Sequence, residues 1–561
     1  MASEQALVDE RQPRRRLVAL VVGTFAFYLL TGSRERPWGD AQVMWEVAVA
    51  LIERHAIDIA FEWPPMSHRG ADGLVYAQYP ILPSLAQVPG ATAHAWLSEW
   101  WPRHRGLWWP VCSHLAPALA GAWTVAMTDR LGRRLGASPR AAMITAAVTA
   151  TATGLWVYAR YSYSEALQAA CYSTLLWHGL QLHRYNRHRD AIGLGLWLGL
   201  AFNTKPVFAV AGFALAPLLA WWAWRADGPT TRRARCRNLV VASLALAPFV
   251  ALFAIYNAAR WGNPLTTGYE DTLAYIAGES PWFGAWGLLA SPGKSVFLYS
   301  PPLVAAAVGW VWQWRTARTD SAFVLLPTLA VMFTYTRYLN WSGGWCFGPR
   351  YWLFATPVLM LGFATAVDRL WAQPRRAQMV PACVLSTCVA AGVAVQILGN
   401  LFYWDHFIRI AKAARTDWLG DPDRSGSKLP ARGRGHCDSC FEDMYPLLWL
   451  PAFQPIEGHL WLARSLAAEH DWQQAEAHAP WTRYTDKTLD IRRTYRRARL
   501  DWWGMIGLDR KRSRGTAVGV GAMWFVMLGS AVWLGRSSGR STRRTNPSPP
   551  SERGDAPRDD T

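Results

Sequence analysis

Apolar runs of roughly 18 to 22 residues recur along this chain, about the length that a helix needs to cross a bilayer. The composition agrees, because 51% of the 561 residues are hydrophobic and only 17% are charged. The sequence therefore predicts an all-α, polytopic helical membrane protein.

Seven blocks of basic residues separate the apolar runs and set the expected topology. Cytoplasmic loops of membrane proteins are enriched in Lys and Arg, and neighbouring blocks here are separated by enough apolar sequence for two crossings. We therefore expect about twelve spans with both termini cytoplasmic, and we interpret the net charge of +19 as a topology signal rather than as nucleic-acid binding. The first eleven expected spans are residues 17–32, 111–128, 139–158, 165–182, 190–204, 207–224, 238–256, 300–314, 320–336, 351–368 and 379–401.

This topology leaves a long first external loop, residues 33–110. Within it, Val43, Met44, Val47, Ala50 and Leu51 follow a helical period, which predicts a helix lying along the membrane surface with Asp40 at its front. The stretch 80–97 is long enough to span, but counting it as a span would place the basic segment at 131–136 outside. We therefore expect it to be a half-buried or interfacial helix.

The remaining domains follow from composition. Residues 1–16 form the expected cytoplasmic tail, and 17–401 the transmembrane domain. Residues 402–515 are polar, contain an amphipathic helical pattern and predict a small, mostly helical extracytoplasmic domain. Residues 516–535 are the expected last span, followed by a disordered cytoplasmic tail, 536–561. Cys437 and Cys440 lie in the external domain, where a structural disulfide and a redox or zinc role both remain open.

The expected external ends of the spans carry cations where the topology rule predicts few. Because Arg and Lys bind phosphate, and the acyl tail of a lipid can stay in the bilayer, this pattern predicts a site for a lipid-linked phosphate at the outer leaflet. The cations are Arg160, Lys205, Arg260, Lys294, Arg337 and Arg350, accompanied by the acidic residues Asp40 and Glu165.

Several motifs in order resemble a known family. The first loop opens with an acidic residue in "WGDAQVMWEVAVALIERHAIDI", continues as "DGLVYAQYPILPSLAQVPG", and "GRRLG" follows the second span. Later come "YNAARWGNPLTTGY", "GLLASPGKSVFLYSPPL" and "WSGGWCFGPRYWLFATP". Together they resemble the GT-C superfamily of polytopic glycosyltransferases, in particular bacterial relatives of the protein mannosyltransferases and the lipid A aminoarabinose transferase. The resemblance covers about residues 17–401.

The resemblance implies an enzyme of the bacterial cytoplasmic (inner) membrane that transfers a hexosyl or pentosyl group from a polyprenyl-phosphate donor to an extracytoplasmic glycan, lipid or protein. It matches Asp40 to the family's first-loop acid, as general base or metal ligand, and Glu165 to a second catalytic acid. It matches Lys205 to a cation near the outer end of the fifth span, and places Tyr76 in a segment that shapes the substrate cavity. The remaining expected phosphate-binding residues are Arg160, Arg260, Arg337 and Arg350.

Other interpretations remain open. Many family members have two adjacent acids in the first loop, but Ala41 follows Asp40, which weakens a divalent metal ion held by an acidic pair. Asp40 can also serve as a helix N-cap, and Lys205 can reach lipid headgroups. A lipid-linked glycan transporter or flippase would use the same outer cations. A non-catalytic envelope scaffold on the same fold, binding a partner through residues 402–515, is the third reading.

Overall fold

The computed structural model describes residues 2–63, 66–102, 105–269, 280–338, 340–344, 346–419, 445–483, 495, 500–502, 521–530 and 532–533. Most of these residues are helical, which confirms the predicted all-α class. The described residues include one small antiparallel sheet, formed by β1 (Ser67–Arg69) and β2 (Val75–Ala77), with Ser67 opposite Ala77.

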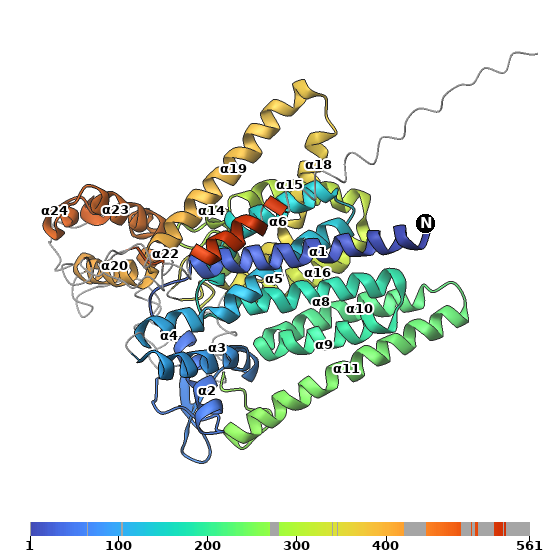
Figure 1. Ribbon diagram of the computed structural model, residues 1–561, viewed down its shortest axis with the longest axis horizontal. Coiled ribbons are helices and arrows are strands. Elements are labelled where there is room, and N and C mark those ends of the chain that lie inside the picture. The colour runs from blue at the N-terminus through green and yellow to red at the C-terminus, as the bar shows by residue number, and fades with distance from the viewer. Residues whose placement is uncertain are drawn as a thin grey trace, which may run out of the picture.

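Long helices lying side by side form the body of the molecule (Figure 1). Helix α9 packs between α8 and α11, α5 packs against α1 and α8, and α15 packs against α18. The helices of this bundle are α1 (Ala2–Leu30), α5 (Leu115–Arg134), α6 (Pro139–Thr151), α7 (Leu155–Ala159), α8 (Glu165–Tyr185), α9 (His188–Thr204), α10 (Ala209–Trp224), α11 (Pro229–Trp261), α15 (Pro302–Thr316), α16 (Arg318–Thr336), α17 (Thr356–Leu359), α18 (Leu361–Trp371) and α19 (Arg375–Leu401).

Each expected span between residues 17 and 401 coincides with one helix or with shorter helices in series. Helix α1 begins at Ala2, so residues 2–16 are helical as well, and their cytoplasmic location stays a prediction. Three helices in the described ranges are long and apolar enough to cross a membrane by length and composition: Pro206–Trp224, Pro229–Trp261 and Arg375–Leu401. The count of about twelve spans therefore stays a prediction.

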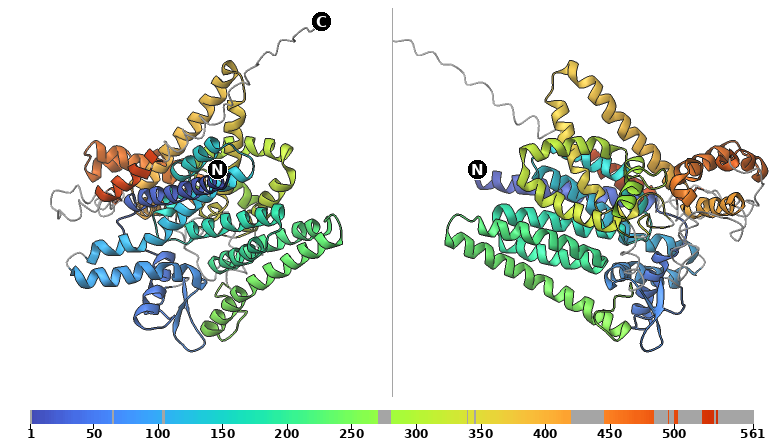
Figure 2. Two further views of the ribbon diagram at one scale, coloured as in Figure 1. Left: turned by 45° about the vertical axis from the view of Figure 1, so that its right-hand side comes forward. Right: turned by 180° about the vertical axis from the view of Figure 1, so that it is seen from behind.

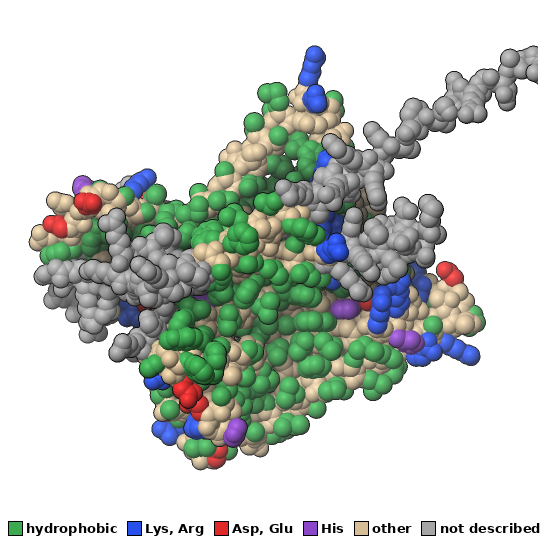
Figure 3. Space-filling model, viewed as in Figure 1, with side chains coloured by type: hydrophobic (Ala, Val, Ile, Leu, Met, Phe, Trp, Pro, Cys, Tyr) green, Lys and Arg blue, Asp and Glu red, His purple; other side chains and the backbone are tan. Residues whose placement is uncertain are grey.

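The two ends of the bundle differ in the way that the basic blocks predict. The N-terminus and the turns from α8 to α9 and from α10 to α11 lie at the right of Figure 1, and Lys and Arg side chains gather at that end in Figure 3. The first loop and the helices between residues 404 and 477 lie at the opposite end. Apolar side chains such as Phe213 and Ile255 are exposed on the flank between the ends, as lipid-facing side chains would be.

The first loop is folded rather than extended. It contains α2 (Asp40–Glu53), the sheet, α3 (Ile81–Trp100) and α4 (Arg105–Ser113), with α3 packed against both α2 and α4. The predicted helices at 40–53 and 80–97 are therefore present as α2 and α3. Their position at the membrane surface stays a prediction.

The described residues between 404 and 483 are largely helical and lie beyond the end of the bundle (Figure 2). Helix α23 packs against both α19 and α20. The elements are α20 (Trp404–Leu419), α22 (Tyr445–Trp449), η5 (Pro451–Phe453), α23 (Pro455–Ala467), α24 (Trp472–Ala477) and η6 (Pro480–Arg483). Gly521–Ser530 form a further short apolar helix. Cys437, Cys440 and the predicted disordered tail lie outside the described residues.

Two short turns connect helices of the bundle. They are the 3-10 turns η2 (Pro206–Phe208), between α9 and α10, and η3 (Arg350–Trp352), before α17. The short helices α13 (Pro281–Ala290) and α14 (Val296–Tyr299) precede α15.

Candidate functional site

Three of the candidate residues meet although they are far apart in sequence. The guanidinium Nη1 of Arg350 lies 3.0 Å from Oδ2 of Asp40, and its Nε lies 3.8 Å from Oε1 of Glu165. Asp40 begins α2, Glu165 begins α8, and Arg350 begins η3. The side chains are 17%, 5% and 12% exposed respectively, so the ion pairs form largely out of water.

Asp40 is the first helical residue of α2 and not its N-cap. The N-cap is Gly39, whose φ of 62° lies in the left-handed region that glycine adopts without strain. The carbonyl of Gly39 accepts the first bonds of the helix, from the amides of Gln42 and Val43. The carboxylate of Asp40 is thus directed to Arg350, near the helix N-terminus, where the dipole favours a negative charge.

Glu165 is more deeply enclosed than Asp40. In the part of the chain that the structure describes, its Oε2 atom is buried and accepts no hydrogen bond. Buried polar atoms are nearly always paired in native proteins, and each exception calls for an explanation such as a ligand or a catalytic role. Oε2 of Glu165 can therefore accept a hydrogen bond from a hydroxyl group or bind a proton.

Lys205 adds a second cation to the same cluster. Its Nζ lies 4.2 Å from the centroid of the Tyr351 ring and 5.2 Å from that of Tyr335, and these two rings stack with centroids 4.8 Å apart. Lys205 follows the last residue of α9 and precedes Pro206, which disfavours helical backbone at position 205 and ends the helix there. Burial, together with repulsion from Arg350, lowers the pKa of Lys205 to about 8.

Tyrosines surround the four charged groups. Arg350 lies over the rings of Tyr163 and Tyr351, in each case with Cζ 5.4 Å from the centroid. Burial raises the pKa of Tyr79, and the negative charge of the nearby Asp40 carboxylate raises it further. Tyr163, Tyr335 and Tyr351 were not among the site residues predicted from the sequence. Their only local signal is proximity in sequence to Glu165, Arg337 and Arg350.

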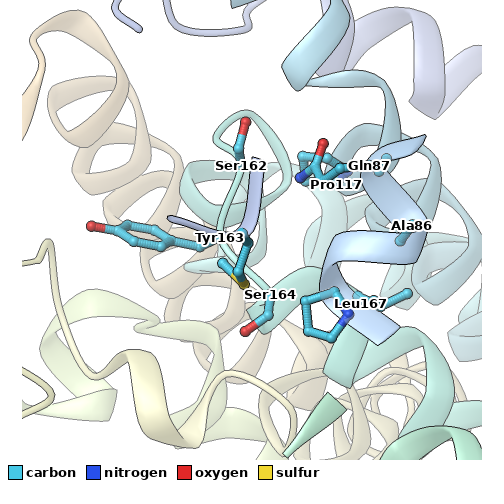
Figure 4. Close-up of a pocket in the computed structure, with 10 residues that line it drawn as sticks. Ala86, Gln87, Pro117, Ser162, Tyr163, Ser164 and Leu167 are labelled. Carbon is cyan, nitrogen blue, oxygen red and sulfur yellow. The ribbon is translucent and has the colours of Figure 1, made fainter. Parts of the chain in front are cut away.

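A small pocket adjoins this cluster behind Tyr163 (Figure 4). Its walls come from α2, α3, α5 and the turn before α8, and its lining includes Met44, Gln87, Pro117, Ser164 and Leu167. In Figure 4 the ring of Tyr163 is directed away from Gln87 and Pro117. Tyr163 thus lines the pocket and also contacts Arg350 of the charged cluster.

Arg160 is engaged elsewhere. It is almost fully buried, its Nη2 lies 2.6 Å from Oδ2 of Asp501, and its Nη1 donates to the carbonyl of Asn400 at 3.0 Å. The same carboxylate of Asp501 accepts from the hydroxyl of Ser33. This guanidinium joins the segment around Asp501 to the bundle, so the structure does not support the phosphate-binding role predicted for Arg160.

Arg260 and Tyr76 also lie in structural networks. Arg260 is buried, stacks on Tyr256, and donates to the carbonyls of Ala77 and Tyr79 and, at 2.7 Å, to Oδ1 of Asn257. Arg260 thereby holds the loop that presents Tyr79 to Asp40, which places it one step away from the cluster. The Tyr76 hydroxyl donates to Oδ2 of Asp72 at 2.6 Å, and burial, with this bond, raises the pKa of Tyr76 to about 12.

Arg337 is exposed at the end of α16. Its predicted phosphate contact remains a prediction.

The carboxylates of this cluster are not arranged as the ligands of a metal ion. Within the described ranges, no three His, Cys, Asp or Glu side chains come together as metal ligands. Asp40 and Glu165 are directed to the guanidinium of Arg350 instead.

Comparison with known proteins gives one family match. Residues 111–255 match the family model described as dolichyl-phosphate-mannose-protein mannosyltransferase. This match confirms the predicted resemblance to that family over these residues, which include Glu165 and Lys205 but not Asp40 or Arg350. No curated protein matches the chain.

Solved structures show weak likenesses. ArnT from Cupriavidus metallidurans bound to undecaprenyl phosphate is similar over 71% of this chain and 71% of its own, at 17% identity and a TM-score of 0.47. The archaeal oligosaccharyltransferase AglB from Archaeoglobus fulgidus, in complex with an inhibitory peptide and a dolichol-phosphate, is similar over 73% of this chain and 58% of its own, at 12% identity and a TM-score of 0.42. Likenesses at this level assign no function to this chain.

Proposed function

We propose that this chain is an integral membrane glycosyltransferase that transfers a sugar from a polyprenyl-phosphate donor to an extracytoplasmic acceptor. The observation that carries the proposal is the meeting of two carboxylates and two cations, Asp40, Glu165, Lys205 and Arg350, in one buried cluster. The family match over residues 111–255 supports the reaction class.

The two cations suit the charge that develops during such a transfer. A polyprenyl-phosphate sugar carries one negative charge, and the departing polyprenyl phosphate gains a second as the bond to the anomeric carbon breaks. Cations held in a site of low dielectric stabilise that new charge more strongly than they stabilise the bound donor, which is the condition for a faster reaction. We assign this role to Lys205 and Arg350.

Asp40 is the better candidate for the general base. Its side chain is 17% exposed against 5% for Glu165, so an acceptor hydroxyl reaches it more readily. As long as Arg350 pairs with Asp40, the carboxylate is held as a counter-ion. A donor phosphate that engages Arg350 releases Asp40 to remove the proton from the attacking hydroxyl.

Glu165 completes the site in this proposal. Its buried Oε2 atom, which accepts no hydrogen bond within the described residues, can receive one from a sugar hydroxyl. Such a bond positions the sugar relative to Asp40 and gives the site a means of selecting hydroxylated substrates.

The surface next to Lys205 suits the lipid part of the donor. Lys205 connects α9 to η2 and α10, and α10 exposes apolar side chains such as Phe213 and Trp224. A polyprenyl tail can therefore remain in the bilayer along α10 while its phosphate reaches Lys205. This arrangement suits a bacterial cytoplasmic membrane with the site on its outer face.

A transporter fits the geometry less well. Transporter sites lie near the middle of the bilayer between broken helices. Here Asp40 and Glu165 are the first residues of their helices, and Lys205 follows the last residue of α9.

Transfer can be tested in membranes. Membranes containing the chain are incubated with radiolabelled polyprenyl-phosphate sugars, and envelope glycans of wild-type and deletion strains are compared by mass spectrometry. The proposal predicts label in an extracytoplasmic acceptor and a missing sugar in the deletion strain. Unchanged glycans without transfer would instead support the scaffold interpretation, and movement of intact lipid-linked glycan would support the transporter.

A further inference from the structure

Lys294 is one of the outer cations that the sequence predicts for phosphate binding, but the structure gives it another environment. It is 2% exposed, and its ammonium group is surrounded by oxygen and sulfur atoms of one loop. Its Nζ lies 3.0 Å from the carbonyl oxygens of Gly344 and Cys346, 3.2 Å from that of Gly348, and 3.0 Å from Sγ of Cys346.

The surrounding loop is folded around this cation. Gly343, Gly344 and Gly348 all have φ between 70° and 74°, a conformation that side-chain-bearing residues rarely adopt. These turns allow three carbonyls to point at a single centre. The carbonyl of Phe347 is directed elsewhere and accepts from the hydroxyl of Tyr158 at 3.0 Å.

The loop leads directly into the candidate site. The carbonyl of Gly348 accepts both from Nζ of Lys294, at 3.2 Å, and from the backbone amide of Arg350, at 3.1 Å. At the other end of the loop, a Cβ added to Gly343 would lie 2.8 Å from Cγ of Arg350. The loop therefore contacts Arg350 through its backbone at one end and packs against its side chain at the other.

We propose that the carbonyls of Gly344, Cys346 and Gly348 form a cage for a small cation, that Lys294 supplies the resident ammonium, and that Lys294 is thereby a positioning residue for Arg350. An ammonium offers three N–H donors and suits the three carbonyls. Without it, buried carbonyls lose their partners, and the loop has to rearrange to find new ones. The link to transfer rests on the proposed function, whereas the cage itself does not.

Truncation followed by chemical rescue tests the cage. Lys294→Ala removes the atoms from Cγ to Nζ, and n-propylammonium has the same number of carbon and nitrogen atoms. We expect Lys294→Ala to bind undecaprenyl phosphate more weakly, by about tenfold, because charge-assisted hydrogen bonds from Arg350 to the phosphate weaken when Arg350 is displaced. Millimolar n-propylammonium should restore binding and raise the melting temperature of the purified variant.

Two controls separate the cage from general effects of salt and packing. Tetramethylammonium has the same charge but no N–H donor and should restore neither property. Lys294→Met fills the space of the lysine side chain but donates no hydrogen bond. It should therefore bind undecaprenyl phosphate as weakly as Lys294→Ala and remain insensitive to n-propylammonium.

The outcomes are distinguishable. Wild-type binding by Lys294→Met, or a failure of n-propylammonium to stabilise Lys294→Ala, overturns the inference. If Lys294→Ala is recovered folded only when n-propylammonium is present during growth and purification, the cage is supported, and if it is not recovered even then, the inference is overturned. If the wild-type protein binds no undecaprenyl phosphate, the proposed function fails, while the shift in melting temperature still tests the cage.

Discussion

Arg350 and Asp40 are counter-ions, with Nη1 and Oδ2 3.0 Å apart, and Arg350 also lies 3.8 Å from Glu165. The candidate phosphate-binding cation therefore keeps the candidate base neutralised. This arrangement predicts that donor binding precedes activation of the acceptor, because a phosphate that engages Arg350 competes for it with Asp40.

The first prediction concerns Arg350 itself. Arg350→Met leaves two largely buried carboxylates without their cation, and removing one partner of a buried ion pair typically lowers stability by about 3–5 kcal/mol. We expect a correspondingly lower melting temperature, measured by thermal unfolding in detergent. The double variant with Glu165→Gln should recover part of the loss, since one unpaired charge is then removed. A melting temperature for Arg350→Met equal to that of the wild type would contradict the ion-pair assignment.

The second prediction is a pH dependence that comes from Lys205. Its pKa is lowered to about 8, chiefly by burial, so the ammonium is charged below that pH and loses its proton as the pH rises through it. We expect kcat/KM for the donor, which reports groups of the free enzyme, to fall by about tenfold per pH unit above pH 8.

Lys205→Arg is the matched control, because a guanidinium keeps its charge throughout this range. Its profile should stay flat between pH 7 and 9. A fall of equal steepness in both proteins would show that a different group titrates.

The third prediction compares two glycines that share a left-handed backbone. Gly343 has φ +74° and Gly73 has φ +82°. A Cβ added at Gly343 would lie 2.8 Å from Cγ of Arg350, whereas a Cβ added at Gly73 would meet nothing within 4 Å. Each alanine variant should lose stability by about 1 kcal/mol through strain. Gly343→Ala alone should also weaken undecaprenyl phosphate binding, measured on the purified proteins. Equal binding by the two variants would show that the 343–348 loop does not position Arg350.

The fourth prediction separates a structural role from a phosphate-binding role for Arg160. Arg160→Met leaves the buried carboxylate of Asp501 unpaired and should destabilise the protein, whereas Arg160→Met with Asp501→Leu replaces the pair by apolar groups and should recover stability. We expect sugar transfer by the double variant to return with its stability. Recovered stability without transfer would restore the phosphate role predicted from the sequence.

The helices were largely predictable, because apolar length and basic blocks are local signals. Helices α8 to α10, for example, lie close to the spans expected at 165–182, 190–204 and 207–224. The extension of α1 back to Ala2 could not be predicted, since residues 2–16 contain no long apolar run.

The candidate site was predictable only in part. The excess of outer cations pointed to Lys205 and Arg350, but the same signal also included Arg160, Arg260 and Lys294. Which cation serves a ligand depends on its tertiary partner, and the partner of Arg160 is 341 residues away at Asp501. The stacked rings around Lys205 were missed for the same reason, because Tyr335 and Tyr351 meet it only in the folded chain.

In the proposed reaction, Asp40 acts as the base in sugar transfer from a polyprenyl-phosphate donor. The most direct measurement is the transfer rate of Asp40→Asn at saturating donor, beside Asp58→Asn, which alters a first-loop aspartate paired with Arg54, whose side chain is 47% exposed. We predict that kcat of Asp40→Asn falls by about 10²–10⁴-fold, the usual contribution of a general base, and that Asp58→Asn behaves as the wild type. A wild-type rate for Asp40→Asn would show that Asp40 is not the general base.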